Sequence, residues 1–232
     1  DQAISAINGV AGTTVAAPFS EDVEGGNVTP AGWSLQNPDN ATTWETAAVA
    51  NGADCAATTA WTIDYYSYNS VGQEDRLLSP MIDLSASAGT HLTFDHAYAR
   101  YSDSYYDGFR VDISNDCGSS WNNLYSAEGT ALATAADNTS SNWQPANCSE
   151  WASHDIDLSA YDGQTVMLRF VGTCGYGQHL YFDNVNVSGS SVAVSVRMYL
   201  EGCYNTTEHR MDDQLRATGQ LPSTEPDRKS VV

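Results

Sequence analysis

Asp183 is the carboxylate whose position most clearly suggests chemistry. In segment 181–187, the two-residue period of a strand places Asp183 on the same face as Val185 and Val187. A carboxylate on an apolar face has to be hydrogen-bonded, paired with a cation or bound to a metal. Because the chain has only 9 Lys and Arg residues, calcium is one interpretation, since Ca²⁺ takes six to eight oxygen ligands. The alternatives are that Asp183 accepts backbone N–H bonds at a strand end, or that the opposite face is the buried one.

Tyrosine is unusually common, with 13 residues against 5 phenylalanines. Two aromatic groups lie beside Ser, Asn, Asp and Gly residues: Trp61, Tyr65, Tyr66 and Tyr68, and then Tyr98, Tyr101, Tyr105 and Tyr106. Aromatic rings carried on loops stack against sugar rings or bind partner proteins. We therefore name a candidate ligand-binding platform made of Tyr65, Tyr66, Tyr105 and Tyr106. The alternative is that these rings cover the core and expose only their hydroxyls.

The signatures of common catalytic sites are missing from the sequence. It contains no His-Glu-x-x-His zinc motif, no Gly-x-Ser-x-Gly nucleophile turn and no glycine-rich phosphate loop. Paired carboxylates hydrolyse glycosides, and Glu21, Asp22 and Glu24 lie close together. The two-residue period puts Glu21 on one face and the other two acids on the opposite face, so a solvated acidic turn is the better interpretation. We expect no catalytic activity.

The five cysteines, at positions 55, 117, 148, 174 and 203, show no C-x-x-C spacing and no accompanying histidine cluster. A zinc site is therefore not expected, and buried thiols or one to two disulfides remain. The lysine-poor composition favours an extracellular protein and hence disulfides. A bond between Cys117 and Cys148 would restrain the loop-rich segment 130–146. Cys55 with Cys174 is a weaker pairing, which leaves Cys203 unpaired.

Short strands separated by turns have to position these residues. Apolar and polar residues alternate in 91–98, 109–114 and 166–171, and 77–84 is a strand interrupted by Pro80. Turn clusters lie between these runs, and no convincing helix precedes residue 190. The pattern predicts an all-β protein built as an antiparallel sandwich.

The length of 232 residues indicates one large domain, or one domain plus an extension. We expect residues 1–16 to be a linker or edge strand, residues 17–190 to be the sandwich domain, and residues 191–232 to begin a following unit. Within that extension, 192–200 alternates like a strand and 208–219 is the only helix-like segment.

Charge and composition exclude several classes of partner. The formal net charge of -20 repels phosphate backbones and anionic membranes, so no nucleic-acid partner is expected. No apolar run approaches the roughly 18 residues that a membrane span requires. Charged residues make up 16% of the chain, against about 25% in an average protein. Small polar residues supply the surface instead, which favours a secreted or cell-surface protein.

The order of several short motifs resembles a known family. The motifs lie at 18–26, 30–33, 77–84, 94–100, 111–121 and 180–185. Their ordered set spans roughly residues 17 to 188. It resembles MAM-like jelly-roll domains and, more closely, the choice-of-anchor J and cleaved-adhesin domains of secreted Bacteroidetes proteins.

The resemblance implies a non-catalytic β-jelly-roll with a structural calcium ion. Carried over residue by residue, the calcium ligands are Glu24 and Asp183, with Asp39 less secure. The function expected from it is an extracellular adhesion or binding module of a larger protein, with a glycan or an extracellular protein as ligand and neighbouring domains of the same precursor as further partners. The alternative is a structural spacer or assembly domain appended to a secreted peptidase or other hydrolase.

Overall fold

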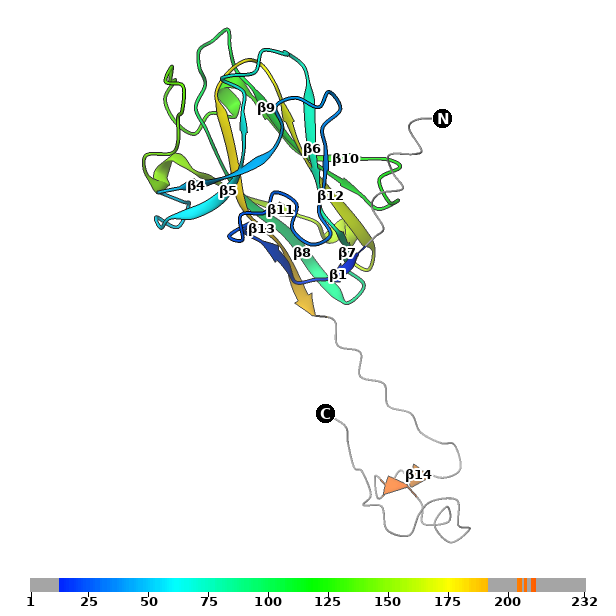
Figure 1. The fold of residues 1–232 in the computed structure, drawn as a ribbon. Helices are drawn as coiled ribbons and strands as arrows, with labels where there is room; N and C mark the ends of the chain where they lie inside the picture. The colour runs from blue at the N-terminus through cyan, green and yellow to red at the C-terminus, as the bar shows by residue number, and fades with distance from the viewer. Residues whose placement is uncertain (1–12, 192–203, 206, 208–209, 212–232) are drawn as a thin grey trace. The chain divides into compact units, whose positions relative to one another are not determined.

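The computed structural model describes residues 13–191, 204, 205, 207, 210 and 211. The chain divides into two compact units, Asp1–Val192 and Ala193–Val232, and each is described by itself. In the first unit two β-sheets pack face to face (Figure 1). The expected all-β jelly-roll sandwich is confirmed.

One sheet has seven strands, with β12 at its centre. Its members are β1 (Thr14–Ala16), β3 (Ser34–Gln36), β6 (Glu74–Leu78), β7 (Met81–Asp83), β9 (Gly108–Ser114), β10 (Asn122–Glu128) and β12 (Thr165–Thr173). β12 pairs antiparallel with β6, β7 and β9, while β3 adds to β6 and β10 to β9. β1 pairs parallel with β7. As the sequence predicts, Pro80 separates β6 from β7.

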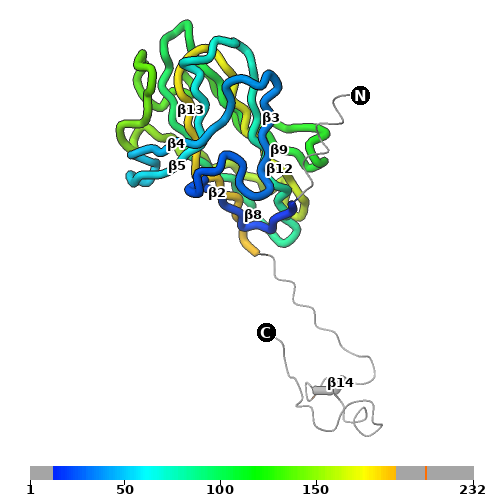
Figure 2. Tube along the Cα trace, viewed as in Figure 1, coloured from blue at the N-terminus to red at the C-terminus, as the bar shows by residue number. Residues whose placement is uncertain are grey.

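The other sheet has six strands, and β13 is its hub. Its members are β2 (Phe19–Glu21), β4 (Glu45–Val49), β5 (Thr58–Asp64), β8 (Ser87–Tyr98), β11 (Ala152–Asp157) and β13 (His179–Ser191). β13 pairs antiparallel with β2, β5 and β8. Figure 2 shows the early strand β2 in blue beside this late strand. β13 continues through the glycine and serine residues 188–191, up to the predicted end of the sandwich domain.

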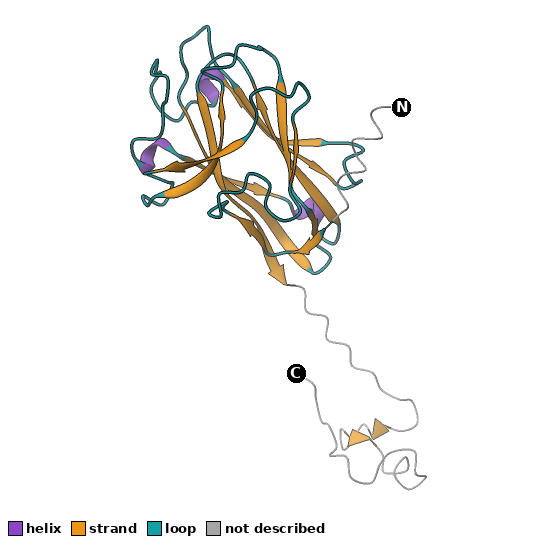
Figure 3. Ribbon diagram, in the orientation of Figure 1, coloured by secondary structure: helices purple, strands orange, loops and turns teal. Residues whose placement is uncertain are grey.

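Aromatic rings fill the space between the sheets. The Phe182 ring stacks between Trp61, 4.7 Å away, and Phe170 of the opposite sheet, 4.9 Å away. The alternating runs behave as predicted, because one face of each run lies in this core. Burying each such side chain contributes roughly 1.5–3 kcal/mol. Among the residues that the structure describes, the helical segments are short 3₁₀ turns, at Gly129–Ala131, Cys148–Glu150 and Ser159–Tyr161 (Figure 3).

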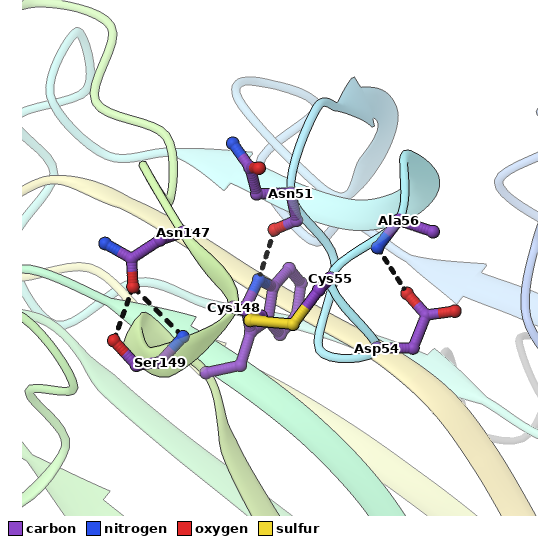
Figure 4. Close-up of a disulfide and its surroundings, with 8 residues drawn as sticks. Asn51, Asp54, Cys55, Ala56, Asn147, Cys148 and Ser149 are labelled. Atoms are coloured by element: carbon purple, nitrogen blue, oxygen red, sulfur yellow. Dashed lines mark hydrogen bonds between the residues drawn. A yellow bond between two sulfur atoms is a disulfide. The ribbon is translucent and has the colours of Figure 1, made fainter.

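A disulfide joins Cys55 to Cys148 (Figure 4). Both predicted pairings are therefore wrong: Cys117 is an exposed thiol and Cys174 a buried one. Cys117 lies in the turn that follows β9 of the seven-stranded sheet, whereas Cys148 lies in the β10–β11 loop. The bond does restrain that loop, but its partner is in the β4–β5 turn, 93 residues away in sequence.

The β10–β11 loop packs on the outer face of the six-stranded sheet. Trp143 and Trp151 join Tyr181 in a second, smaller apolar cluster there. The Tyr181 hydroxyl donates to the Trp143 carbonyl at 3.0 Å, and the Trp151 indole donates to the Asn51 carbonyl at 2.8 Å. These tryptophans and the disulfide fix the loop over the sheet.

The second unit contains two short described strands, β14 (Tyr204–Asn205) and β15 (Arg210–Met211), which pair antiparallel. The helix-like interpretation of 208–219 is therefore wrong at residues 210–211, where cross-strand pairing prevails over a weak helical pattern. The rest of that segment and the predicted strand 192–200 lie outside the described residues. In the described part of the chain, no helix has the length and apolar character of a membrane span.

Candidate functional site

Three loops meet at one end of the sandwich, the upper end in Figure 1. They are the β5–β6 loop (65–73), the β8–β9 loop (99–107) and the β12–β13 loop (174–178). Strand register places them together. The first residue of β13 pairs with the last residue of β5, and the next residue of β13 pairs with the last residue of β8. The last residue of β12 likewise pairs with the first residues of β6 and β9.

Four tyrosines form a continuous row across these loops. Tyr66 lies 6.0 Å from Tyr101, Tyr101 lies 6.0 Å from Tyr105, and Tyr105 lies 5.7 Å from Tyr176, measured between ring centroids. Tyr105 and Tyr176 are 45% and 41% exposed. We call Tyr66, Tyr101, Tyr105 and Tyr176 the tyrosine row. Such a surface offers several aromatic faces together with phenol hydroxyls that donate and accept hydrogen bonds.

The buried carboxylate of Asp107 fastens two of the loops together. It accepts backbone N–H bonds from Gly175, Gly177 and Gln178 at 2.7, 3.1 and 2.7 Å, and a hydroxyl bond from Tyr98 at 3.0 Å. Burial raises the pKa of Asp107, and these hydrogen bonds act in the opposite direction. The glycines allow the close approach, because a Cβ on Gly177 would lie 2.3 Å from the carboxylate.

Further bonds hold the neighbouring loops in place. Arg100 binds both oxygens of Asp137, at 2.9 and 3.0 Å, and so ties the β8–β9 loop to the β10–β11 loop. The Cys174 thiol donates to the Tyr68 carbonyl at 3.2 Å, and the Cys174 N–H donates to the Gln73 carbonyl at 2.9 Å. The tyrosine row is therefore carried on loops whose positions are set before any ligand binds.

The structure divides the four predicted platform residues. Tyr66 and Tyr105 lie in the tyrosine row. Tyr65 is 0% exposed and belongs to the core, which corrects its assignment to the platform, because its position continues the inward face of β5. Tyr106 is exposed but packs against Gly129 and lines a separate hollow of about 290 Å³. Tyr101 and Tyr176 complete the row; the glycines on both sides of Tyr176 are the sequence signal for an exposed turn.

Asp183 is buried, but on a different face from the one that the sequence predicts. The register between β13 and β8 shifts between Asp183 and Asn186, and Asn184 adopts a left-handed conformation with φ of 56°. Such a bulge reverses the alternation of faces. Phe182 and Val185 both lie in the core, so Asp183 points to the outer face of the six-stranded sheet.

Thr58 joins two carboxylates at that outer face. Its hydroxyl lies 2.6 Å from a Glu24 oxygen and 2.8 Å from an Asp183 oxygen. A backbone N–H from Thr59 also donates to Glu24, at 2.9 Å. Burial raises the pKa of Asp183 to about 7; the hydrogen bond from Thr58 lowers it, while the nearby Glu24 and Asp22 carboxylates add to the rise. The pKa of Glu24 is lowered by its bonds to Thr58 and Thr59.

The chemistry of this corner suits a hard cation, because its donors are all oxygen and two are carboxylates. In the described ranges, however, no group of three or more His, Cys, Asp and Glu side chains is arranged to hold a metal. A calcium ion bound by Glu24 and Asp183 would need further oxygens from hydroxyls, carbonyls and water. The third predicted ligand, Asp39, lies apart from this pair: it bonds with the Tyr68 hydroxyl and the Ala41 N–H.

A polar groove of about 510 Å³ runs across the outer face of the six-stranded sheet. Its acidic and amide side chains are Glu21, Asp22, Asp95, Asp155, Asn184 and Asn186. Asp95 accepts a bond from Asn184 at 2.8 Å and one from Ser153 at 2.5 Å, so its carboxylate is held by neighbours. The groove is a second surface on which a hydroxyl-rich ligand would find partners.

Comparison with known proteins identifies the fold. No family model matches the sequence, and no curated protein matches it significantly. Two cleaved adhesin domains of Lys-gingipain from Porphyromonas gingivalis have similar structures. One is 18% identical with a TM-score of 0.53, and the match covers 75% of this chain and 99% of that domain. The other is 18% identical with a TM-score of 0.50, and the match covers 74% and 98%.

A carbohydrate-binding module, TmCBM61 in complex with β-1,4-galactotriose, is 12% identical with a TM-score of 0.47, covering 73% of this chain and 94% of that one. At these identities the likeness to the adhesin domains defines the fold alone. The first unit of the chain has a β-jelly-roll fold similar to that of these cleaved adhesin domains. The predicted resemblance is confirmed at that level.

Proposed function

We propose that the chain is a non-catalytic extracellular binding module that recognises a neutral glycan through the tyrosine row. The observation that carries this proposal is the unbroken series of Tyr66, Tyr101, Tyr105 and Tyr176 rings over three mutually fastened loops. Sugar rings present C–H groups to aromatic faces and hydroxyls to phenol oxygens. The net charge of -20 disfavours sulfated or otherwise anionic glycans.

The test compares adjacent tyrosines. The whole chain is screened on a glycan array, and the affinity for a neutral oligosaccharide that it binds is then measured by calorimetry. Tyr105→Ala should weaken binding at least tenfold, or about 1.4 kcal/mol. Tyr106→Ala is the matched control, because Tyr106 is exposed but lies outside the row; it should bind as the unmodified chain does.

Two outcomes would overturn the assignment. If Asp95→Ala abolishes binding and Tyr105→Ala does not, the polar groove is the glycan site. If the folded chain binds no glycan, the alternative of a structural spacer or assembly domain in a secreted protein is favoured.

We also propose a structural calcium ion between Glu24 and Asp183. The support is a buried carboxylate beside a second one, with a single hydroxyl between them. Calcium would neutralise both and tie the segment after β2 to β13. At free calcium equal to 100 times its dissociation constant, binding adds about 2.7 kcal/mol to the free energy of unfolding. A chelator should therefore lower the melting temperature, and Asp183→Asn should reduce that response. Identical melting with and without chelator would contradict this calcium site.

A further inference from the structure

A row of three residues from neighbouring strands faces the interior near the loop end. Asp75 of β6 is directly opposite Gly172 of β12, and Asn37 follows the last residue of β3, one step beyond the pair Gln36–Arg76. Residues opposite one another in an antiparallel pair share a face. Leu77 and Phe170, two positions away on the same strands, lie in the core, so Asp75, Gly172 and Asn37 face inward.

Tyr65 of the opposite sheet reaches into this row. A Cβ on Gly172 would lie 2.3 Å from the Tyr65 hydroxyl, so the phenol oxygen occupies the side-chain space that this glycine leaves. Opposite side chains in such a pair begin about 4.5–5.5 Å apart. The Tyr65 hydroxyl and the Asp75 carboxylate therefore share one small interior region, and a glycine is required beneath them.

Three buried oxygens on these segments lack a hydrogen-bond partner among the described residues: Asn37 Oδ1, Tyr65 Oη and Asp75 Oδ2. Asn37 is partly buried, and its amide N–H donates to the Ala41 carbonyl at 3.0 Å. The other Asp75 oxygen accepts from the Thr43 hydroxyl at 3.1 Å. Leaving one buried polar atom unpaired costs about 1–3 kcal/mol, and more for a charged group. Three such atoms in one region, contributed by three different segments, indicate that they share a partner.

The charges around Asp75 favour a positive partner. Asp75 is 0% exposed, and burial raises its pKa to about 6, so it is largely ionised at neutral pH. The Asp39 carboxylate is close enough to raise that pKa further. The nearest compensating cation, Arg76, alternates to the opposite face and pairs with Glu74 at 2.7 Å. Burial also raises the pKa of Tyr65, so its hydroxyl stays neutral.

We propose that Asp75, Asn37 and Tyr65 line a buried site for a hard cation of the calcium class, distinct from the Glu24–Asp183 corner. Asp75 supplies a carboxylate oxygen, Asn37 an amide oxygen and Tyr65 a phenol oxygen, and Thr43 orients Asp75 from the side. Asp39 lies on the β3–β4 loop, where it bonds with the Tyr68 hydroxyl and acts electrostatically on Asp75. A mixed set of oxygen donors from loops and strand ends suits Ca²⁺ better than the rigid octahedron of Mg²⁺.

The experiment counts calcium ions bound by the whole chain. Chelator-treated protein is titrated with Ca²⁺ alone, by calorimetry and elemental analysis, for the unmodified chain, Asp75→Asn, Asp183→Asn and the double variant. The expected numbers of ions are about two, one, one and none. If the Asp75 site binds calcium but the Glu24–Asp183 corner does not, Asp183→Asn binds as many calcium ions as the unmodified chain, and Asp75→Asn binds none.

A milder variant protects the test against misfolding. Thr43→Val preserves shape but removes the group that orients Asp75, and should weaken the site about 10- to 100-fold. Terbium luminescence adds a local readout, because Tyr65 and Trp44, whose indole donates to the Asp75 carbonyl at 3.1 Å, would sensitise a bound ion. Emission should persist in Asp183→Asn, and Asp75→Asn should lose the part of the emission that Asp183→Asn retains. If folded Asp75→Asn and Thr43→Val bind calcium with the number and affinity of the unmodified chain, the proposal is wrong and the three oxygens are hydrated.

Discussion

Asp107 and Asp183 are both buried carboxylates, but they accept different numbers of hydrogen bonds. Asp107 receives three backbone N–H bonds and one hydroxyl bond. Asp183 receives one N–H bond from Asn184 and one hydroxyl bond from Thr58, and that hydroxyl also lies against Glu24. Burial raises the pKa of both, but only for Asp183 do two neighbouring acids rank among the main causes of the rise.

The number of hydrogen-bond donors around a buried carboxylate determines how far its charge is balanced by the protein itself. Four donors directed at Asp107 balance its charge and turn it into a fastener for loops. Asp183 has half as many donors and an acidic neighbour, so its charge is either removed by protonation, since its pKa is raised to about 7, or balanced by the cation proposed above. The number of hydrogen-bond donors therefore distinguishes the two buried carboxylates. We expect the loop end, which Asp107 fastens, and the Glu24–Asp183 corner to respond differently to the changes described below.

Removing the disulfide should have the largest effect on stability and should separate the two regions. Replacing Cys55 and Cys148 together by alanine releases a loop closed over 93 residues. The chain-entropy account predicts a loss of about 4.5 kcal/mol in the free energy of unfolding. Urea denaturation measures this loss. Glycan binding by the tyrosine row should persist, because Cys55 and Cys148 lie outside its loops; a parallel loss of binding by the folded variant would mean that the regions are coupled.

Asp107→Asn tests whether the hydrogen bonds to Asp107 stabilise the loop end. The amide keeps the size of the side chain but presents an N–H group to backbone N–H donors. The variant should lose about 3 kcal/mol, measured by urea denaturation, and should bind the glycan less tightly. Asp103→Asn is the control, since Asp103 lies in the same loop and is 90% exposed; it should change stability by less than about 0.5 kcal/mol. Equal effects of the two variants would contradict the fastening role of Asp107.

His96 is a third buried titratable group. Both of its ring hydrogen bonds can form only while the imidazole is neutral. Its Nε2 donates to the Leu132 carbonyl at 2.9 Å, and its Nδ1 accepts from His154 at 2.7 Å. Burial lowers its pKa to about 4, from 6.5 in the unfolded chain. The unfolded chain therefore takes up the proton first, so stability is full above pH 6.5 and falls as the pH drops toward 4.

Between pH 6.5 and 5 the loss from His96 should reach about 2 kcal/mol. Burial also lowers the pKa of His154, whereas Asp95 acts against both shifts. Urea unfolding at a series of pH values measures the dependence. Because the raised pKa values of Asp183 and Asp75 give a slope of the opposite sign, the contribution of His96 is the difference between the slopes of the unmodified chain and of His96→Gln. An unchanged slope in that variant would assign the pH dependence to other groups.

The smallest effect on stability is expected in the tyrosine row. Tyr105→Ala should change the free energy of unfolding by less than about 0.5 kcal/mol, because the ring is largely exposed and serves the ligand rather than the core. Tyr65→Ala should cost about 3–5 kcal/mol, as other large-to-small changes in cores do. Thermal melting of the two variants tests whether the tyrosines divide as described; similar losses would place Tyr105 in the core as well.

The sequence predicts the strands well because local alternation determines them. Leu92, Phe94 and His96 are buried on one face as their spacing indicates, and Pro80 interrupts pairing because it has no N–H. The face of Asp183 could not be predicted, since it depends on a bulge at Asn184. A single residue in a left-handed conformation reverses all later alternation, and asparagine in a strand is a weak signal for it.

Contacts between residues far apart in the sequence also could not be predicted. Cys148 bonds with Cys55 rather than Cys117 because the β10–β11 loop folds across the sheet that does not contain Cys117, and no local pattern encodes that path. Tyr65 and Tyr66 are neighbours in sequence, yet one continues the inward face of β5 and the other begins the loop. Only the end of the strand separates a core residue from a candidate binding residue.

The central position of β13 has a consequence for the order of folding. This strand is the last of the sandwich to be synthesised, yet it pairs with β2, β5 and β8. The six-stranded sheet can therefore be completed only after residues 179–191 have been synthesised, although β4 with β5 and β8 with β11 can pair without them. Pairing across such sequence distances makes folding slow. Completion of the six-stranded sheet is therefore expected to be a late step in the folding of the sandwich.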